Sequence, residues 1–283
     1  MKVFAWVNSS LDGACSAIAL KNILKCQLTT GEANSHNFSG LLKGWVIDNF
    51  SSYDKVFIVG LIIPDEVSQL LDNERVVIVD NYNIKQEYKH AKTIFDEKSS
   101  CTEVILDKLT HQCGDSLQLL YNMVGDYCSN TLGIPNSIKL NAVFMGYNRP
   151  KVDKFIKRYE RGFSEFDAHE KNSIKLYFNR LREALTGTEF FTGVIKDSKV
   201  VSCFANHAMS DIANFALKKY SAEVAIVVNL ETRTVLFRRS KNNNIKVNIL
   251  AEKLCSGSGR DDVAAGSITD TFLAFSKTLC QCM

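Results

Sequence analysis

The chain of 283 residues has no long apolar segment, and no run approaches the roughly 20 apolar residues that a membrane-spanning helix needs. Its first residues, Met1 to Val7, also lack the basic region, the apolar region and the cleavage site of a signal peptide. These absences predict a cytoplasmic protein without a membrane partner.

The nine cysteines are odd in number and scattered, with no CxxC pair and no His/Cys cluster at zinc spacing. We therefore expect reduced, mostly buried thiols rather than a disulfide framework or a zinc site. A large surplus of charge is also absent, because the net charge is only +3. A surplus of this size does not by itself require a nucleic-acid or membrane partner.

Apolar, β-branched segments alternate with helical segments in the first part of the chain, and this alternation is typical of a parallel, doubly wound sheet. Strands are expected at 2–7, 27–30, 55–60 and 76–79, with helices at 14–25, 38–49 and 65–71. Pro64 stands where the last of these helices begins, a favoured position for proline.

The middle of the chain is helical and the last third is again rich in strands. Helices are expected at 102–109, 116–126 and 155–185, and strands at 194–195, 200–205, 223–229 and 234–238. The charged segment 155–185 is interpreted as a linker with a solvated face; a nucleic-acid surface is the alternative. The fold class is thus α/β with two domains: an N-terminal domain (1–148), a helical linker (149–188), and a smaller C-terminal α/β domain (189–283). An active-site cleft is expected between the two domains.

Asp80 follows the buried strand 76–79 directly, and ligands of open α/β sheets bind at the carboxyl ends of such strands. Asp12 lies in the loop that leads from the first strand into the first helix. The unpaired N–H groups of a helix start make this corner favourable for anions. The alternative for Asp12 is an ordinary N-cap of its own helix.

Four segments of the first half carry these polar residues in a fixed order. They are the loop 8–16 with Ser10 and Asp12, the strand end at Gly60, the triplet Asp80-Asn81-Tyr82, and the helical stretch around Asp126. This order resembles the DHH phosphoesterase superfamily, which includes RecJ-type nucleases, oligoribonucleases and cyclic dinucleotide phosphodiesterases. The resemblance covers nearly the whole chain. It implies a site in which aspartates and histidines hold two divalent metals that activate water for phosphodiester hydrolysis.

Several of the implied ligands are replaced in this chain. Ser10, Gly60, Asn81 and Tyr82 stand where the superfamily has aspartates or histidines, and the histidine of the first motif is absent. Asp12, Asp80 and Asp126 remain as candidate metal ligands. Three carboxylates with water molecules suit one octahedral Mg²⁺ or Mn²⁺ ion, weakly bound, whereas two adjacent ions would be under-coordinated. We therefore assign no catalytic residue.

The C-terminal third resembles the DHH-associated domain. A strand ends in Arg239-Ser240, and the segment 257–266 resembles the glycine-rich signature, with Arg260 in place of a glycine and Asp261 in place of a histidine. The resemblance implies a phosphate-binding loop and a nearby substrate-contacting loop. The residues expected to bind substrate are Asn206, His207, Arg239, Ser240, Gly257, Ser258, Gly259 and Arg260. The alternatives are ordinary surface arginines and a structural His207.

These residues favour a catalytically degenerate protein that binds nucleotides, short oligonucleotides or cyclic dinucleotides. One alternative is an active Mn- or Mg-dependent phosphodiesterase or phosphatase with a reduced metal site. Another is a scaffold for a protein partner, because a fold does not fix a function. A homodimer and a protein partner both stay open at this point.

Overall fold

The computed structural model describes residues 1–34, 37–81, 84, 86–109, 113–195, 197–241 and 243–281. Tyr82 of the third motif therefore lies outside the described residues, as do His36 and His111. The chain divides into two compact units, Met1–Tyr177 and Phe178–Met283. In the described part of the chain, no helix is both long and apolar enough to cross a membrane.

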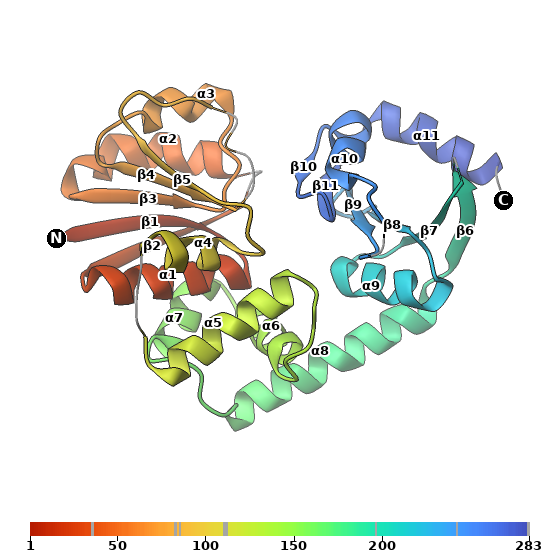
Figure 1. Ribbon diagram of the computed structural model, residues 1–283, viewed down its shortest axis with the longest axis horizontal. Coiled ribbons are helices and arrows are strands. Elements are labelled where there is room, and N and C mark those ends of the chain that lie inside the picture. Colours follow the sequence, from red (N-terminus) through yellow and green to blue (C-terminus); the bar gives the residue numbers. More distant parts are fainter. Residues whose placement is uncertain are drawn as a thin grey trace. The chain divides into compact units, whose positions relative to one another are not determined.

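The first unit is built on a sheet of five parallel strands in the order β2-β1-β3-β4-β5 (Figure 1). The strands are β1 (Lys2–Asn8), β2 (Gln27–Ala33), β3 (Lys55–Val59), β4 (Val76–Asp80) and β5 (Lys92–Phe95). Strands β1, β3 and β4 are almost entirely buried, as expected for central strands that are covered on both faces. Their carboxyl ends consequently meet at one edge of the sheet.

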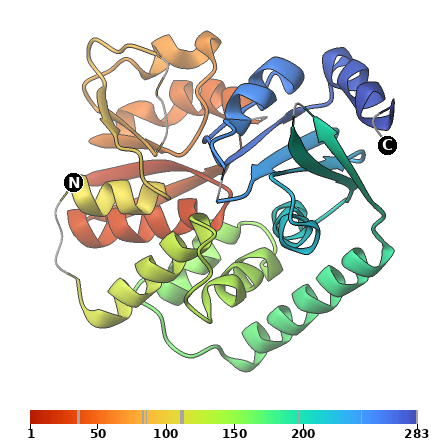
Figure 2. The ribbon, with the colours of Figure 1, turned by 45° about the vertical axis from the view of Figure 1, so that its right-hand side comes forward.

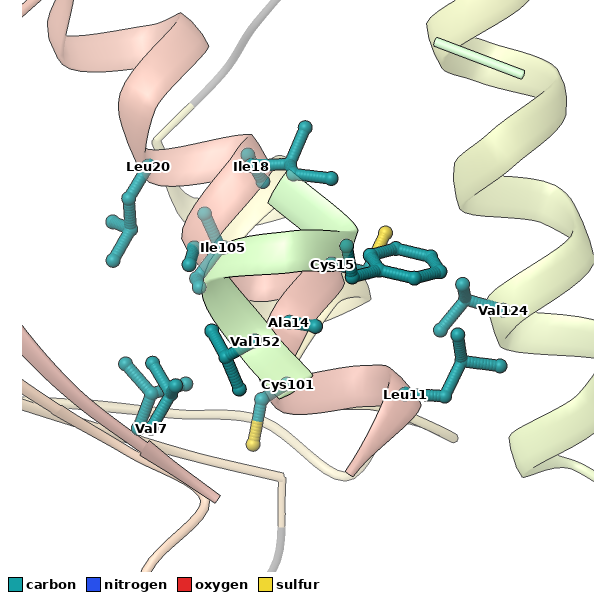
Figure 3. Close-up of a cluster of buried hydrophobic side chains, with 14 of the residues drawn as sticks. Val7, Leu11, Ala14, Cys15, Ile18, Leu20, Cys101, Ile105, Val124 and Val152 are labelled. Atoms are coloured by element: carbon teal, nitrogen blue, oxygen red, sulfur yellow. The ribbon is translucent and has the colours of Figure 1, made fainter. Parts of the chain in front are cut away.

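Helices cover both faces of this sheet, so successive residues of a strand point into two different cores. Val3 and Val7 of β1 pack in one core, with α1, α4, α5, α6 and α7, whereas Phe4 and Trp6 pack in the other, with α2 and α3. The helices are α1 (Leu11–Leu24), α2 (Phe38–Asn49), α3 (Asp65–Ser68), α4 (Cys101–Lys108), α5 (Asp115–Cys128), α6 (Ser137–Gly146), α7 (Lys151–Tyr159) and α8 (Ala168–Gly187). Figure 3 shows part of the first core, in which Cys101 lies near Val7 and Leu11.

The second unit contains a six-stranded sheet in the order β10-β11-β9-β8-β7-β6 (Figure 2). Among the described strand pairs of this sheet, only β7 and β8 run parallel, and α9 connects them. The elements are β6 (Phe190–Ile195), β7 (Ser198–Phe204), α9 (Met209–Tyr220), β8 (Val224–Asn229), β9 (Thr234–Arg239), α10 (Val247–Cys255), β10 (Ser258–Gly259), β11 (Val263–Ser267) and α11 (Asp270–Gln281). One face of the sheet packs against α10 and α11, and the other packs against α9 and the last turns of α8.

The predicted α/β architecture with a parallel N-terminal sheet and a second α/β part is confirmed. Three strands were missed: β5, β10 and β11. The segment 155–185 forms parts of two helices, α7 and α8, rather than one continuous helix. The boundary between the compact units falls at Tyr177/Phe178, within α8.

Candidate functional site

The carboxyl ends of β1, β3 and β4 place Asn8, Gly60 and Asp80 at one edge of the first sheet. The register aligns Val7 with Val59 and Val59 with Val79, so the residue that follows each lies at the same level. The side-chain amide of Asn8 donates to the carbonyl oxygen of Gly60 over 3.1 Å, which ties β1 to β3 at this level. This is the edge at which an open α/β sheet binds its ligands.

Asp12 uses its carboxylate to hold the start of α4, a helix 89 residues further along the chain. Its two oxygens accept hydrogen bonds from the backbone N–H of Cys101 (2.8 Å) and of Thr102 (3.0 Å), and from the Thr102 hydroxyl (2.8 Å). A carboxylate at a helix N-terminus satisfies unpaired N–H groups and the positive end of the helix dipole. The alternative that Asp12 caps its own helix is wrong, because Ser10 is the N-cap of α1.

Cys101 fills the space beside Gly60. A Cβ atom added to Gly60 would lie 3.2 Å from the Cys101 sulfur, and Gly60 also has a positive φ of 61°, which disfavours other residues. The thiol is 1% exposed and donates to the side-chain oxygen of Asn81 over 3.4 Å. Burial, and then the negative charges of Asp12 and Asp80, raise the pKa of Cys101 well above its usual value. Position 60 thus faces a neutral thiol.

Asp80 is the last residue of β4 and is 7% exposed. It pairs in the sheet with Phe95 of β5, and Asn81 is held by a bond from its amide to the carbonyl oxygen of Lys98 (3.1 Å). Asp12 accepts a hydrogen bond from the backbone N–H of Cys101, and the Cys101 thiol binds Asn81, the residue that follows Asp80. The two aspartates are thus connected through a cysteine that the sequence predicts only as a buried thiol.

Asp126 is engaged elsewhere. Near the end of α5, its carboxylate accepts hydrogen bonds from the backbone N–H of Gly133 (2.8 Å) and of Ile134 (3.0 Å), and from the Ser137 hydroxyl. It therefore orders the loop that leads into α6.

These residues do not fit a two-metal centre. Of the positions where the resemblance implies ligands, Gly60 has no side chain, Asn81 is neutral, and the carboxylate of Asp12 is already hydrogen-bonded to α4. Among the residues with described positions, no group of three or more His, Cys, Asp or Glu side chains is arranged to hold a metal ion. One ion on Asp12, Asp80 and Asp126 stays a prediction, and the hydrogen bonds of Asp12 and Asp126 argue against it.

In the second unit, the expected substrate residues lie at two opposite ends of the sheet. Asn206 and His207 follow β7 and are exposed; the Asn229 amide, at the end of β8, donates to the Asn206 carbonyl over 2.9 Å. Arg239 pairs instead with Val224, at the start of β8. Five residues separate the two ends of β8, about 17 Å of strand. The structure therefore does not bring all eight residues together.

At the Arg239 end, Arg239 donates to the carbonyl oxygen of Asn243, and the charged groups of the glycine-rich segment are paired with one another or with Lys246. Arg260 binds Asp262 through two bonds, of 3.0 and 3.1 Å, and Asp261 forms an ion pair with Lys246 at 3.2 Å. Burial alone would raise the pKa of Asp262, but the bonds and charge of Arg260 lower it, with help from Arg238. A phosphate bound by Arg260 would have to compete with this carboxylate.

The glycine-rich segment forms a β-hairpin. Ser258 and Gly259 form β10 and pair with β11, while the N–H of Gly257 donates to Ala251 and that of Arg260 to Val263. A Cβ atom on Gly257 would lie 2.2 Å from the Ala265 carbonyl oxygen, so glycine is needed here for close backbone contact. Those two N–H groups, which we expected to face a phosphate, thus bind the protein's own carbonyls.

Sequence reasoning did not identify two features of the first unit. Cys101 carries no motif signal beyond its place after Ser100, which is the N-cap of α4. Glu32, at the end of β2, holds the start of α7 and borders a pocket with Arg149. Both depend on contacts between segments far apart in the chain.

No protein-family model matches the sequence, and no curated protein is similar to it in sequence. Solved structures are similar in fold. RecJ from Thermus thermophilus in complex with Mn²⁺ matches with a TM-score of 0.58 and 12% identity over 98% of this chain, which spans about half (51%) of that RecJ. A pGpG-specific phosphodiesterase from Vibrio cholerae matches with a TM-score of 0.57 and 12% identity over 99% of this chain and 98% of that one. The DHH domain of a member of a family of ribosomal proteins matches with a TM-score of 0.62 and 11% identity, over 99% and 87% of the two chains.

Proposed function

Because the chain has the DHH phosphoesterase fold, we propose that it binds nucleotides, short oligonucleotides or cyclic dinucleotides and does not carry out two-metal hydrolysis. The observation that carries this proposal is the use of Asp12. Its carboxylate, which the resemblance assigns to a metal, accepts three hydrogen bonds from Cys101 and Thr102 at the start of α4.

Two divalent ions about 4 Å apart repel each other strongly, and bridging carboxylates and imidazoles must offset that repulsion. Here the only charged groups among the described motif positions at the carboxyl-end edge of the first sheet are Asp12 and Asp80, and the neighbouring Asn8, Gly60, Asn81 and Cys101 are neutral. Redirecting Asp12 toward a metal would also leave two buried N–H groups without an acceptor, at about 1–3 kcal/mol each. The site therefore favours hydrogen bonds between Asp12 and the start of α4 over a metal cluster.

The ligand class is supported by the fold neighbours whose names specify a substrate. The Vibrio protein is specific for pGpG, a dinucleotide, and a protein from Bacteroides fragilis that matches with a TM-score of 0.54 and 14% identity is related to exopolyphosphatases. Both names refer to phosphate-bearing chains.

The test combines binding and turnover on the full chain. Thermal unfolding is measured with AMP, GMP, pGpG, cyclic di-AMP and a short oligonucleotide, and product formation is followed by chromatography with and without Mn²⁺. We expect at least one ligand to raise the melting temperature, since a ligand at one hundred times its Kd stabilises by about 2.7 kcal/mol. We expect no product.

Two results would contradict the proposal. Mn²⁺-dependent hydrolysis that Asp80→Asn abolishes, and that Asp48→Asn leaves intact, would establish the reduced-site enzyme instead. Asp48 is a matched control because it is an exposed carboxylate of the same unit, on α2. The absence of any thermal shift across the panel would remove nucleotide binding and favour a protein-binding scaffold.

A further inference from the structure

A pocket of about 410 Å³ lies beside the carboxyl ends of β1 and β2, and Ser9, Glu32, Asn34, Asn37 and Arg149 line it. Its volume is within the range of small-molecule sites, about 300–1,000 Å³. In the sheet, β2 is three strand positions from β4, about 14 Å, whereas Ser9 directly follows Asn8 at the end of β1. The pocket therefore borders the site described above on its β1 side, and its lining residues are ones that the site does not use.

Glu32 is the fixed acidic group of this pocket. Its carboxylate accepts hydrogen bonds from the Ser9 hydroxyl and from the backbone N–H groups of Lys151 (2.8 Å) and Val152 (3.2 Å), at the start of α7. Partial burial alone would raise the pKa of Glu32, but these bonds and the positive charge of Arg149 lower it. The carboxylate is therefore ionised at neutral pH, and its charge is balanced. A carboxylate has about four acceptor positions, so one remains for a ligand.

Arg149 supplies the positive charge. Its side chain is exposed at the pocket, and within the described ranges its guanidinium forms neither a hydrogen bond nor an ion pair. A guanidinium has five N–H donors in a planar fork that matches the oxygens of a phosphate. Arg149 therefore has the geometry and the capacity to bind an oxyanion.

Two asparagines complete the polar lining. The side-chain oxygen of Asn34 accepts from the Asn37 N–H (3.1 Å), and the side-chain oxygen of Asn37 accepts from the Asn34 N–H (2.8 Å). Because the oxygen of Asn37 is occupied, this side chain offers its NH₂ group as a donor to a ligand. The pocket thus combines one cation, an amide donor and one acceptor beside a balanced carboxylate.

We infer that this pocket binds a nucleoside monophosphate, with Arg149 on the phosphate, Glu32 on a ribose hydroxyl and Asn37 as a further donor. The inference rests on the proposed nucleotide-binding function and assigns it a location. Inorganic phosphate would contact Arg149 but would lack a ribose hydroxyl for Glu32, so we expect it to bind more weakly than a nucleoside monophosphate.

The test is isothermal titration of the full chain with AMP, GMP, adenosine and inorganic phosphate. Arg149→Ala is expected to weaken AMP and GMP binding by about ten- to a hundredfold, the usual effect of removing a charged hydrogen-bond partner. The same change should not alter the weaker binding of adenosine, which has no phosphate. Arg75→Ala is the matched control, because Arg75 is exposed in the same unit but precedes β4, at the opposite edge of the sheet.

A second measurement locates the ligand without a substitution. In amide-resolved NMR spectra of the wild-type chain, AMP should shift the signals of Asn37 and Lys151 and leave that of Arg75 in place. If nucleotides bind and Arg149→Ala binds them as tightly as the wild type, the pocket assignment is overturned while the proposed function stands. If the wild type binds no nucleotide at all, both fall.

Discussion

The carboxylate of Asp12 can either hold the start of α4 or bind a metal ion. The substitution Asp12→Asn tests which of the two roles it has. The asparagine keeps one acceptor oxygen, but its NH₂ group must then face an N–H of Cys101 or Thr102, both of which are buried. The lost charge at the start of α4 costs about 0.5–1 kcal/mol and the unsatisfied buried N–H about 1–3 kcal/mol. We therefore expect the free energy of unfolding to fall by about 1.5–4 kcal/mol.

The assay is thermal unfolding followed by tryptophan fluorescence, which reports on the first unit because both tryptophans, Trp6 and Trp45, belong to it. For a unit of this size the expected decrease in melting temperature is about 3–16 °C. Asp115→Asn is the control: Asp115 is exposed in the first turn of α5, and its loss should cost no more than about 1 kcal/mol. An Asp12→Asn chain that is as stable as the wild type but has lost Mn²⁺ binding would refute the reasoning.

Two further substitutions test the pocket carboxylate and the hairpin. Because the folded pKa of Glu32 is lowered, its stabilisation is present above the unfolded pKa of about 4.3 and is lost as the pH falls through the folded value. Glu32→Gln should therefore be less stable than the wild type at pH 7 and approach it at pH 3 in urea unfolding; an equal deficit at both values would contradict this. Gly257→Ala should destabilise the second unit by about 1–3 kcal/mol through its contact with the Ala265 carbonyl oxygen. Gly44→Ala, in α2 with no atom near the added Cβ, should stabilise by about 0.5–1 kcal/mol; an unchanged Gly257→Ala chain would refute the hairpin geometry.

The central strands were predictable because their residues carry the signal of double burial. Val76 to Val79 is a continuous β-branched run, and such a run fits only a strand that is covered on both faces. β5 and β11 gave no comparable signal. β5 is four residues long with three of them exposed, and β11, Val-Ala-Ala-Gly-Ser, consists mainly of small residues. Their strand conformation is set by pairing with a neighbour, which periodicity along the chain does not encode.

The location of the candidate site was predictable from the sequence, but the roles of its residues were not. That Asp80 ends its strand at the ligand-binding edge follows from the local pattern and from the rule for parallel sheets. The role of Asp12 depends on N–H groups 89 and 90 residues away, and the role of Gly60 depends on the sulfur of Cys101. The glycines of 257–266 were interpreted as a phosphate loop, yet the same residues serve close packing in a hairpin. A glycine pattern does not distinguish these two uses.

Three acidic side chains of the first unit share one arrangement, in which the carboxylate accepts backbone N–H donors at or just before the start of a helix. Asp12 holds the start of α4, Glu32 holds the start of α7, and Asp126 holds the loop into α6. A helix N-terminus offers a carboxylate a partial positive charge and two or more N–H donors, and so satisfies many of the same needs as a divalent ion. Each of these carboxylates is stabilised by hydrogen bonds within the protein. Each also joins segments that are distant along the chain or separated by a loop. Hydrogen bonding to a helix start or to the loop before it is a sufficient structural reason for an aspartate at positions 12 and 126, so the presence of these aspartates in the sequence does not by itself indicate a phosphoesterase.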